Sequence, residues 1–293
     1  MPALPLFVLD ESGGMLKKPA VAPQNRRRTS LADDDSPPAE QIITAGAATL
    51  NEFDRPGMRR LRSVETRACN MPHEPLPDGP YADTRSMRDV HSAFKREFSL
   101  LPTLVRNVSP ADQARANIVA EHIHFLMAIL HEHHSGEDEF LWPKLLDRGS
   151  TDVIETAHLM ESHHATLATI LEDLDSALRA WNGSGATQHA PTLTTVLGRI
   201  IPTLAEHMSL EESQALPMVE RYVTAEEWQK LVASVHARLT DENLTLILGM
   251  VIYESFANSP PPPTGSFEEQ ALRAYGSYCL RIHGAPTPPP LES

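Results

Sequence analysis

Histidine and glutamate recur one helical turn apart at two places in this chain. His133 is followed four residues later by Glu137, and His207 is followed at the same spacing by Glu211. Residues three or four apart in an α-helix share one face, so each pair presents an imidazole and a carboxylate to one point. Burying both groups is costly unless a partner satisfies them, and a metal cation is such a partner. Imidazole and carboxylate together suit iron, manganese or zinc.

Two further histidines extend this pattern. His91 lies on the apolar face of an expected helix, and His164 follows Glu161 by three residues on another. Bundles that direct Glu and Glu-x-x-His groups inward are a known way of holding two metal ions. Four segments that each supply one inward histidine, two of them with a glutamate one turn on, predict a metal site inside a helical bundle.

Each of these residues also has a structural interpretation when it is taken alone. A single histidine on an apolar helix face is more often a core residue than a ligand, and a lone His-x-x-x-Glu is more often a surface pair. His122 lies on an apolar face about three turns from His133, where we expect a core or supporting role. His134 and His163 flank the expected ligands and are weaker candidates for metal contact.

The elements that must position these side chains are helices. Apolar residues recur at helical spacing from residue 83 onward, and no strand pattern is present. Ser109 and Gly149 are expected to cap the second long helix, and Pro102 and Pro217 to bend or stop the first and the fourth. We expect the bundle helices at about 84–107, 109–149, 150–183 and 192–214. The predicted fold class is all-α, a four-helix up-down bundle with extra C-terminal helices and a mostly irregular N-terminal segment.

The composition divides the chain into four parts. Residues 1–82 mix Pro, Gly, Ser and short charge runs without a period, so we expect them to be disordered or loosely attached. Residues 83–220 form the predicted bundle and residues 221–285 a C-terminal helical extension. Residues 286–293 form a proline-rich tail. A capping box, Thr224 with Glu227, opens the extension.

Charge and cysteine content exclude several classes of protein. The net charge is −14, and almost all of the excess negative charge follows residue 70, which argues against a nucleic-acid partner. Two cysteines make neither a disulfide framework nor a thiolate metal site. The longest apolar run, 246–253, is too short to span a bilayer. We expect a soluble, cytoplasmic protein without a membrane partner. A protein that binds the two tails is not identified by the sequence.

The motifs around the two His-x-x-x-Glu pairs resemble the hemerythrin-like (HHE cation-binding) domain. The resemblance covers about residues 84–220 and includes the run from His133 through Glu137 to Pro143, and the run from His207 through Glu211 to Pro217. The region of Tyr275, Tyr278 and 281–284 is similar to larger bacterial proteins of this type.

The resemblance implies a non-haem di-iron site, bridged by two carboxylates and by an oxo or hydroxo group. It implies six ligands: His91, His133, Glu137, His164, His207 and Glu211. Oxygen-carrying members have His-x-x-x-His on the third helix, whereas here Ala168 follows His164 at that spacing. Glu161 is the best replacement for the missing histidine, and His134 or His163 the next. Zinc or manganese would accept similar ligands.

Three functions are compatible with these residues. The favoured one is a di-iron protein that binds, senses or reacts with O2, peroxide or NO, or responds to iron. Turnover of peroxide or O2 stays open, but no organic-substrate enzyme is indicated. The alternatives are a metal-stabilised regulatory or interaction module without turnover, and a purely structural bundle with a degenerate site.

Overall fold

The computed structural model describes residues 78–183, 186–255 and 261–290. Within these ranges the chain is almost entirely helical, and no strand occurs apart from one isolated antiparallel bridge between Tyr81 and Thr224. The predicted all-α class is confirmed. None of the helices in these ranges is both long enough and apolar enough to cross a membrane. Most of the predicted irregular segment, up to residue 77, lies outside the described residues.

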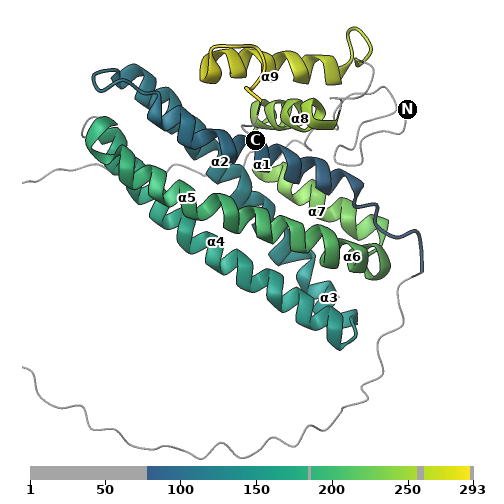
Figure 1. Cartoon of the computed structure of the whole chain (residues 1–293). Coiled ribbons are helices and arrows are strands. Elements are labelled where there is room, and N and C mark those ends of the chain that lie inside the picture. The colour runs from purple at the N-terminus through teal and green to yellow at the C-terminus, as the bar shows by residue number, and fades with distance from the viewer. Residues whose placement is uncertain (1–77, 184–185, 256–260, 291–293) are drawn as a thin grey trace, which may run out of the picture. The chain divides into compact units, whose positions relative to one another are not determined.

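Four long helices form the predicted up-down bundle (Figure 1). They are α1 (Arg85–Arg106), α2 (Gln113–Phe140), α4 (Thr151–Gly183) and α5 (Ala186–Leu210). Each packs against two of the others, in the ring order α1, α2, α4, α5. Their inward faces bury large aliphatic side chains completely, among them Leu126, Leu130, Leu167, Leu174, Leu197 and Ile200. Burial of each such side chain contributes about 1.5–3 kcal/mol.

The second helix begins later than the sequence suggested. Asp112, not Ser109, is its N-cap, and the Asp112 carboxylate accepts a hydrogen bond from the Arg115 N–H at 2.9 Å. The predicted start at Ser109 was therefore wrong. Asp112 is itself a favourable capping residue, and its carboxylate satisfies an N–H group that has no partner within the helix.

The same predicted helix, 109–149, is interrupted at Leu141. The short helix α3 (Trp142–Arg148) continues the chain, with Pro143 in its first turn, where a missing N–H breaks no helical hydrogen bond. Gly149 ends α3 as predicted, and its N–H donates to the Leu145 carbonyl at 2.8 Å. A Cβ at Gly149 would lie 2.5 Å from that carbonyl oxygen, so close packing requires glycine here.

The fourth bundle helix changes its winding at the metal motif. Its α-helical part ends at Leu210, and one π-helical turn, Glu211–Ala215, leads into α6 (Leu216–Tyr222). Pro217 lies in the first turn of α6, while α1 runs through Pro102 without interruption. A π turn inserts an extra residue and so re-aims the side chains that follow it, which is why such turns are frequent at functional sites.

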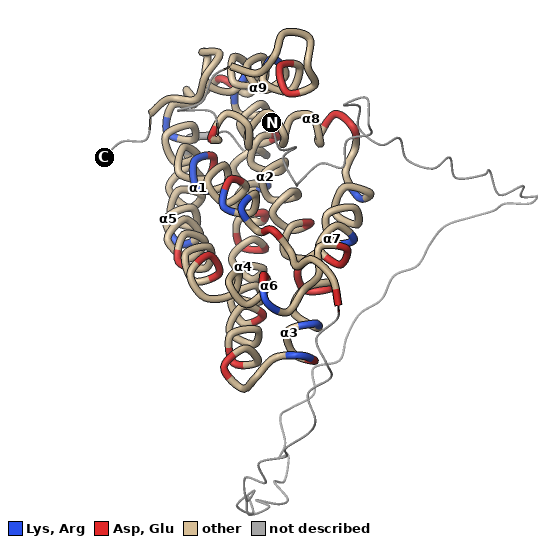
Figure 2. The backbone as a smooth tube through the Cα atoms, turned by 90° about the vertical axis from the view of Figure 1, so that its right-hand side faces the viewer, with Lys and Arg blue, Asp and Glu red and all other residues tan. Residues whose placement is uncertain are grey.

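Three C-terminal helices cover the α1–α2 side of the bundle. α7 (Ala225–Arg238) packs on α2, α8 (Asp241–Ser255) on α1, and α9 (Phe267–His283) on α8 and α2. Both hydrogen bonds of the predicted Thr224–Glu227 capping box are present. Figure 2 shows acidic residues distributed along most of these helices, with lysine and arginine between them.

A buried polar network joins α9 to the bundle. Glu97 on α1 and His122 on α2 are almost fully buried, and Oε2 of Glu97 lies 3.4 Å from Nε2 of His122. The Tyr275 hydroxyl donates to Oε1 of Glu97, and the Tyr278 hydroxyl lies 2.9 Å from Nδ1 of His122. His122 therefore belongs to this network and not to the group of expected ligands.

We predict that Glu97→Gln changes the pH dependence of stability. Burial raises the pKa of Glu97 from 4.5 to about 7, even though the Tyr275 hydrogen bond acts in the opposite direction. The folded chain therefore retains a proton that the unfolded chain loses as pH rises from 4.5 to 7, and wild-type stability falls across that interval. Glutamine keeps an acceptor for Tyr275 but does not ionise. The unfolding free energy of the variant minus that of wild type should increase by about 1–3 kcal/mol between pH 5 and pH 8.

Denaturant unfolding of the metal-free protein at both pH values measures this difference. The exposed Glu121→Gln variant is the control and should show little change with pH. A constant difference between Glu97→Gln and wild type would contradict the burial argument.

Candidate metal centre

Seven side chains converge inside the bundle in two groups. Within each group the potential ligand atoms lie within 4.8 Å of one another. The first group consists of His134, His164 and His207, and the second of His91, His133, Glu137 and Glu211. All four bundle helices contribute, with Glu211 supplied by the π turn that follows α5.

Helix α2 serves both groups because it carries two adjacent histidines. Neighbouring residues on an α-helix point about 100° apart. His133 turns toward α1, where its ring centroid lies 5.5 Å from that of His91. His134 turns toward α4 and stacks on the His164 ring with centroids 4.1 Å apart. One helix thus supplies a potential ligand to each group.

The two buried glutamates lie between the groups. Oε1 of Glu137 is 3.3 Å from Nε2 of His133, and its Oε2 is 3.4 Å from Nε2 of His164. Oε2 of Glu211 is 3.4 Å from Nε2 of His91 and 3.7 Å from Nε2 of His207. Each carboxylate therefore faces one histidine of each group, which is the position of a bridge between two cations.

The donor atoms of this cluster lack hydrogen-bond partners. Both oxygens of Glu137 and of Glu211, and Nε2 of each of the five histidines, are buried and unpartnered. Metal–ligand bonds of about 2.0–2.2 Å place neighbouring donor atoms about 3 Å apart, close to the separations observed. Buried polar atoms without partners are costly, and a cation bound among them would satisfy them. The residues present fit a pair of metal ions.

The protonation of these groups also suits metal binding. Burial lowers the pKa of His133 and His134 well below the usual value, and it lowers the pKa of His207 to about 2. These imidazoles are neutral at physiological pH and offer a lone pair. Burial, together with the Glu137 carboxylate, raises the pKa of Glu211 to about 8. A metal ion that binds Glu211 near neutral pH therefore displaces a proton.

Two outer carboxylates orient the histidines. Nδ1 of His164 lies 2.6 Å from Oδ1 of Asp138, and Nδ1 of His91 lies 3.1 Å from Oε1 of Glu212. Lys95 holds the same Glu212 oxygen at 2.8 Å. A carboxylate on Nδ1 keeps the proton there and leaves Nε2 free for a metal, as in the carboxylate–histidine–metal arrangement.

Burial lowers the pKa of His164, but the nearby carboxylates of Asp138 and Glu137 together outweigh that effect and raise it to about 9. In the absence of a cation this imidazole is protonated and faces both carboxylates. A metal at Nε2 therefore replaces a proton at this position as well.

The structure brings together six of the seven predicted site residues and places Glu161 outside both groups. Oε2 of Glu161 lies 3.0 Å from Nδ1 of His158, and its side chain is 40% exposed. His134, which the sequence ranked lower, takes the remaining position, and His163 belongs to neither group. The signal for His134 was the adjacent pair His133–His134 on a helix with a neighbour on each side.

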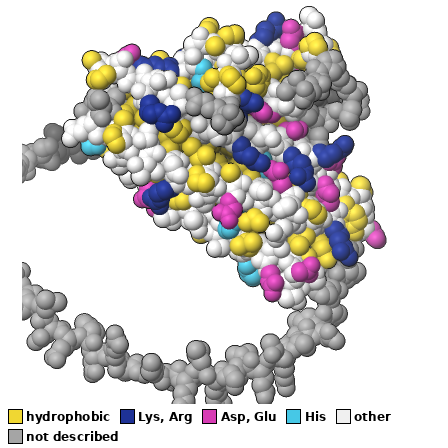
Figure 3. Space-filling view, viewed as in Figure 1, with side chains coloured by type: hydrophobic (Ala, Val, Ile, Leu, Met, Phe, Trp, Pro, Cys, Tyr) yellow, Lys and Arg dark blue, Asp and Glu magenta, His cyan; other side chains and the backbone are white. Residues whose placement is uncertain are grey.

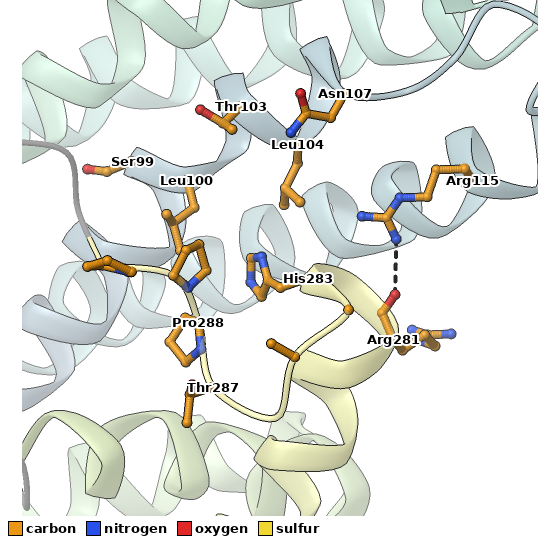
Figure 4. A pocket seen from close by; sticks show the side chains of 14 residues that line it. Ser99, Leu100, Thr103, Leu104, Asn107, Arg115, Arg281, His283, Thr287 and Pro288 are labelled. Carbon is orange, nitrogen blue, oxygen red and sulfur yellow. Dashed lines mark hydrogen bonds between the residues drawn. The ribbon is translucent and has the colours of Figure 1, made fainter.

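A groove in the described surface is lined by residues of this cluster, whereas a larger cavity is not. The cavity, of about 920 Å³, lies where α9 and the following residues meet α1 and α2, and Arg115 donates there to the Arg281 carbonyl at 3.0 Å (Figure 4). None of the seven side chains lines it. The groove, of about 780 Å³ between α2 and α4, is lined by His134 and His164.

Comparison with known proteins identifies the region that holds this cluster. No curated protein and no solved structure matches the chain. The family model for the hemerythrin HHE cation binding domain matches residues 82–219. This range extends from just before α1 into α6 and contains all seven clustered side chains. The resemblance seen in the sequence is confirmed, and residues 82–219 of this chain are a hemerythrin HHE cation binding domain.

Proposed function

We propose that this domain holds two iron ions and that the pair binds, senses or reacts with dioxygen, peroxide or nitric oxide, or responds to iron. The observation that carries the proposal is the placement of Glu137. Its two oxygens face histidines of different groups, so it is set to bridge two cations. Five imidazoles and two carboxylates suit iron, although zinc and manganese accept similar donors.

A bound ferrous pair supplies two electrons for the reduction of a small oxidant. The chain contributes charge, orientation and exclusion of water. Glu137 and Glu211 place two negative charges between the cation positions, and Asp138 and Glu212 hold two imidazoles with Nε2 toward the site.

Apolar side chains surround the cluster and limit the access of water. The ring of Phe94 packs against that of His133 with centroids 5.4 Å apart, and the Trp142 ring lies 5.9 Å from that of His164. Four further apolar side chains on the helices that carry the cluster are almost fully buried: Phe98, Leu130, Ile200 and Leu204. A dry environment strengthens electrostatic interactions within the site and tunes the potential of a bound metal.

Anaerobic loading with ferrous iron tests the proposal directly. We expect about two irons per chain, as in two-metal sites with bridging carboxylates, and a near-ultraviolet charge-transfer absorption after exposure to air. Binding to the folded state alone should also raise the melting temperature. A chain that retains no iron after desalting, with a melting temperature unaffected by chelator, would indicate a degenerate structural site.

Two alanine variants separate the candidates for the seventh ligand. His134→Ala should reduce iron occupancy from about two toward one, because it removes a donor from the three-histidine group. Glu161→Ala should leave occupancy and the charge-transfer absorption unchanged, because its carboxylate is turned toward His158. Elemental analysis of both purified variants provides the measurement. Loss of iron in Glu161→Ala with full occupancy in His134→Ala would reverse this assignment.

A second function, a metal-dependent regulatory module, is supported by the packing of α7 on the ligand-bearing turn of α2. A Cβ at Gly136, next to Glu137, would lie 2.5 Å from Cγ2 of Val235 on α7. Arg238 at the end of α7 bonds Glu139, and its guanidinium lies 3.5 Å from Glu132, both on α2. Displacement of this turn when metal leaves would loosen α7, and the C-terminal extension would then transmit the state of the site.

Hydrogen exchange with and without metal tests this second function. If α7 follows the metal, removal of iron should increase amide exchange in 225–238 by at least tenfold, while exchange in α9 changes less. Equal protection of α7 in both states, together with rapid turnover of peroxide, would favour the reactive function over the regulatory one.

A further inference from the structure

A groove between α2 and α4 reaches the candidate metal centre at His134 and His164. Its volume is about 780 Å³. His134 and His164 form its floor, since they are only 6% and 5% exposed while the other lining residues are more open to solvent. On the α4 side, two of the lining residues are small, Ala165 and Ala168.

Carboxylates surround the mouth of this groove. Asp138, Glu161, Glu172 and Asp175 line it, and no lysine or arginine is among its lining residues. Asp175 is paired with Arg179 outside the groove, so its charge is largely compensated. Asp138 and Glu161 instead contact the imidazoles of His164 and His158, at 2.6 and 3.0 Å. On the face of the molecule drawn in Figure 3, acidic and basic side chains are intermixed.

Behind the floor of the groove, Nε2 of His164 lies 3.4 Å from Glu137 in the buried cluster, while its Nδ1 lies 2.6 Å from Asp138 at the groove. Nε2 of His134 and Nε2 of His164 are buried and lack hydrogen-bond partners. Both histidines belong to the three-histidine group that fits a cation. An acidic mouth that leads to unpartnered imidazole nitrogens attracts cations and offers them a sequence of oxygen and then nitrogen donors.

We propose that this groove is the uptake route for divalent metal ions, with Glu161 and Glu172 as transient carriers and Asp138 as the last carboxylate before His164. The proposal rests on the proposed function in that it takes the cluster as a metal centre. It assigns to Glu161 a kinetic role and not a place among the final ligands. Negative potential in a cleft raises the local concentration of cations and their association rate by roughly 10- to 1,000-fold.

Stopped-flow uptake of Co²⁺ by the metal-free full-length chain tests the route, since the visible absorption of bound Co²⁺ reports binding without any iron chemistry. At low ionic strength the Glu161→Gln/Glu172→Gln double variant should take up Co²⁺ roughly tenfold more slowly than wild type. The final amount bound should be unchanged. The difference should shrink at about 1 M salt, where the Debye length falls to about 3 Å.

Two further variants sharpen the test. Glu155→Gln removes an exposed carboxylate from the same helix outside the groove and should bind at the wild-type rate. Ala168→Leu narrows the groove without changing charge, and should slow uptake at both low and high salt.

Wild-type rates in the double variant and in Ala168→Leu would overturn the route while leaving the metal centre intact. A lower final Co²⁺ content in the double variant would instead make Glu161 or Glu172 a ligand and also overturn it. Absence of Co²⁺ binding by wild type would refute the metal centre itself.

Discussion

The constraint on which this domain depends is that seven side chains bury imidazole nitrogens and carboxylate oxygens without hydrogen-bond partners. Each unpartnered polar atom costs about 1–3 kcal/mol in a protein interior, and here they lie together between four helices. Hydrogen bonds among the side chains do not remove the cost, because the separations between facing nitrogens and oxygens are 3.3–3.7 Å. Cations bound between the groups would satisfy these atoms. The fold therefore carries a cost in its metal-free form that metal binding would relieve, and this would link stability to metal in either proposed function.

The helices meet this constraint through small departures from regular geometry. The π turn at Glu211–Ala215 re-aims the chain where the Glu211 carboxylate joins the cluster, and α2 ends at Phe140, shortly after Glu137. Glycine at position 136 lets α7 approach the turn that carries Glu137. The outer carboxylates Asp138 and Glu212 then fix the imidazoles of His164 and His91. Each departure lies next to a residue of the cluster, so the irregular parts of the bundle coincide with the candidate site.

Much of this arrangement could be predicted from the sequence, because helical periodicity and i to i+4 spacing act locally. The four bundle helices, the inward face of His91, His133, His164 and His207, and the capping box of α7 follow from such patterns. The choice between Glu161 and His134 could not be made from such patterns, because it depends on which neighbouring helix each side chain faces. Glu161, three residues before His164, is rotated about 60° from it and reaches the surface, whereas His134 turns into the bundle toward α4. The π turn and the break at Leu141 were also missed, although a proline follows each of them closely, Pro217 and Pro143.

The most direct test of the central claim is anomalous diffraction from crystals of the iron-loaded protein, recorded on both sides of the iron absorption edge. Two peaks are expected within bonding distance, about 2.0–2.3 Å, of the clustered donor atoms. One should lie among His134, His164 and His207, the other between His91 and His133, with Glu137 and Glu211 reaching both. Absence of any peak among these side chains, or a peak bound at Glu161 with the cluster empty, would contradict the account.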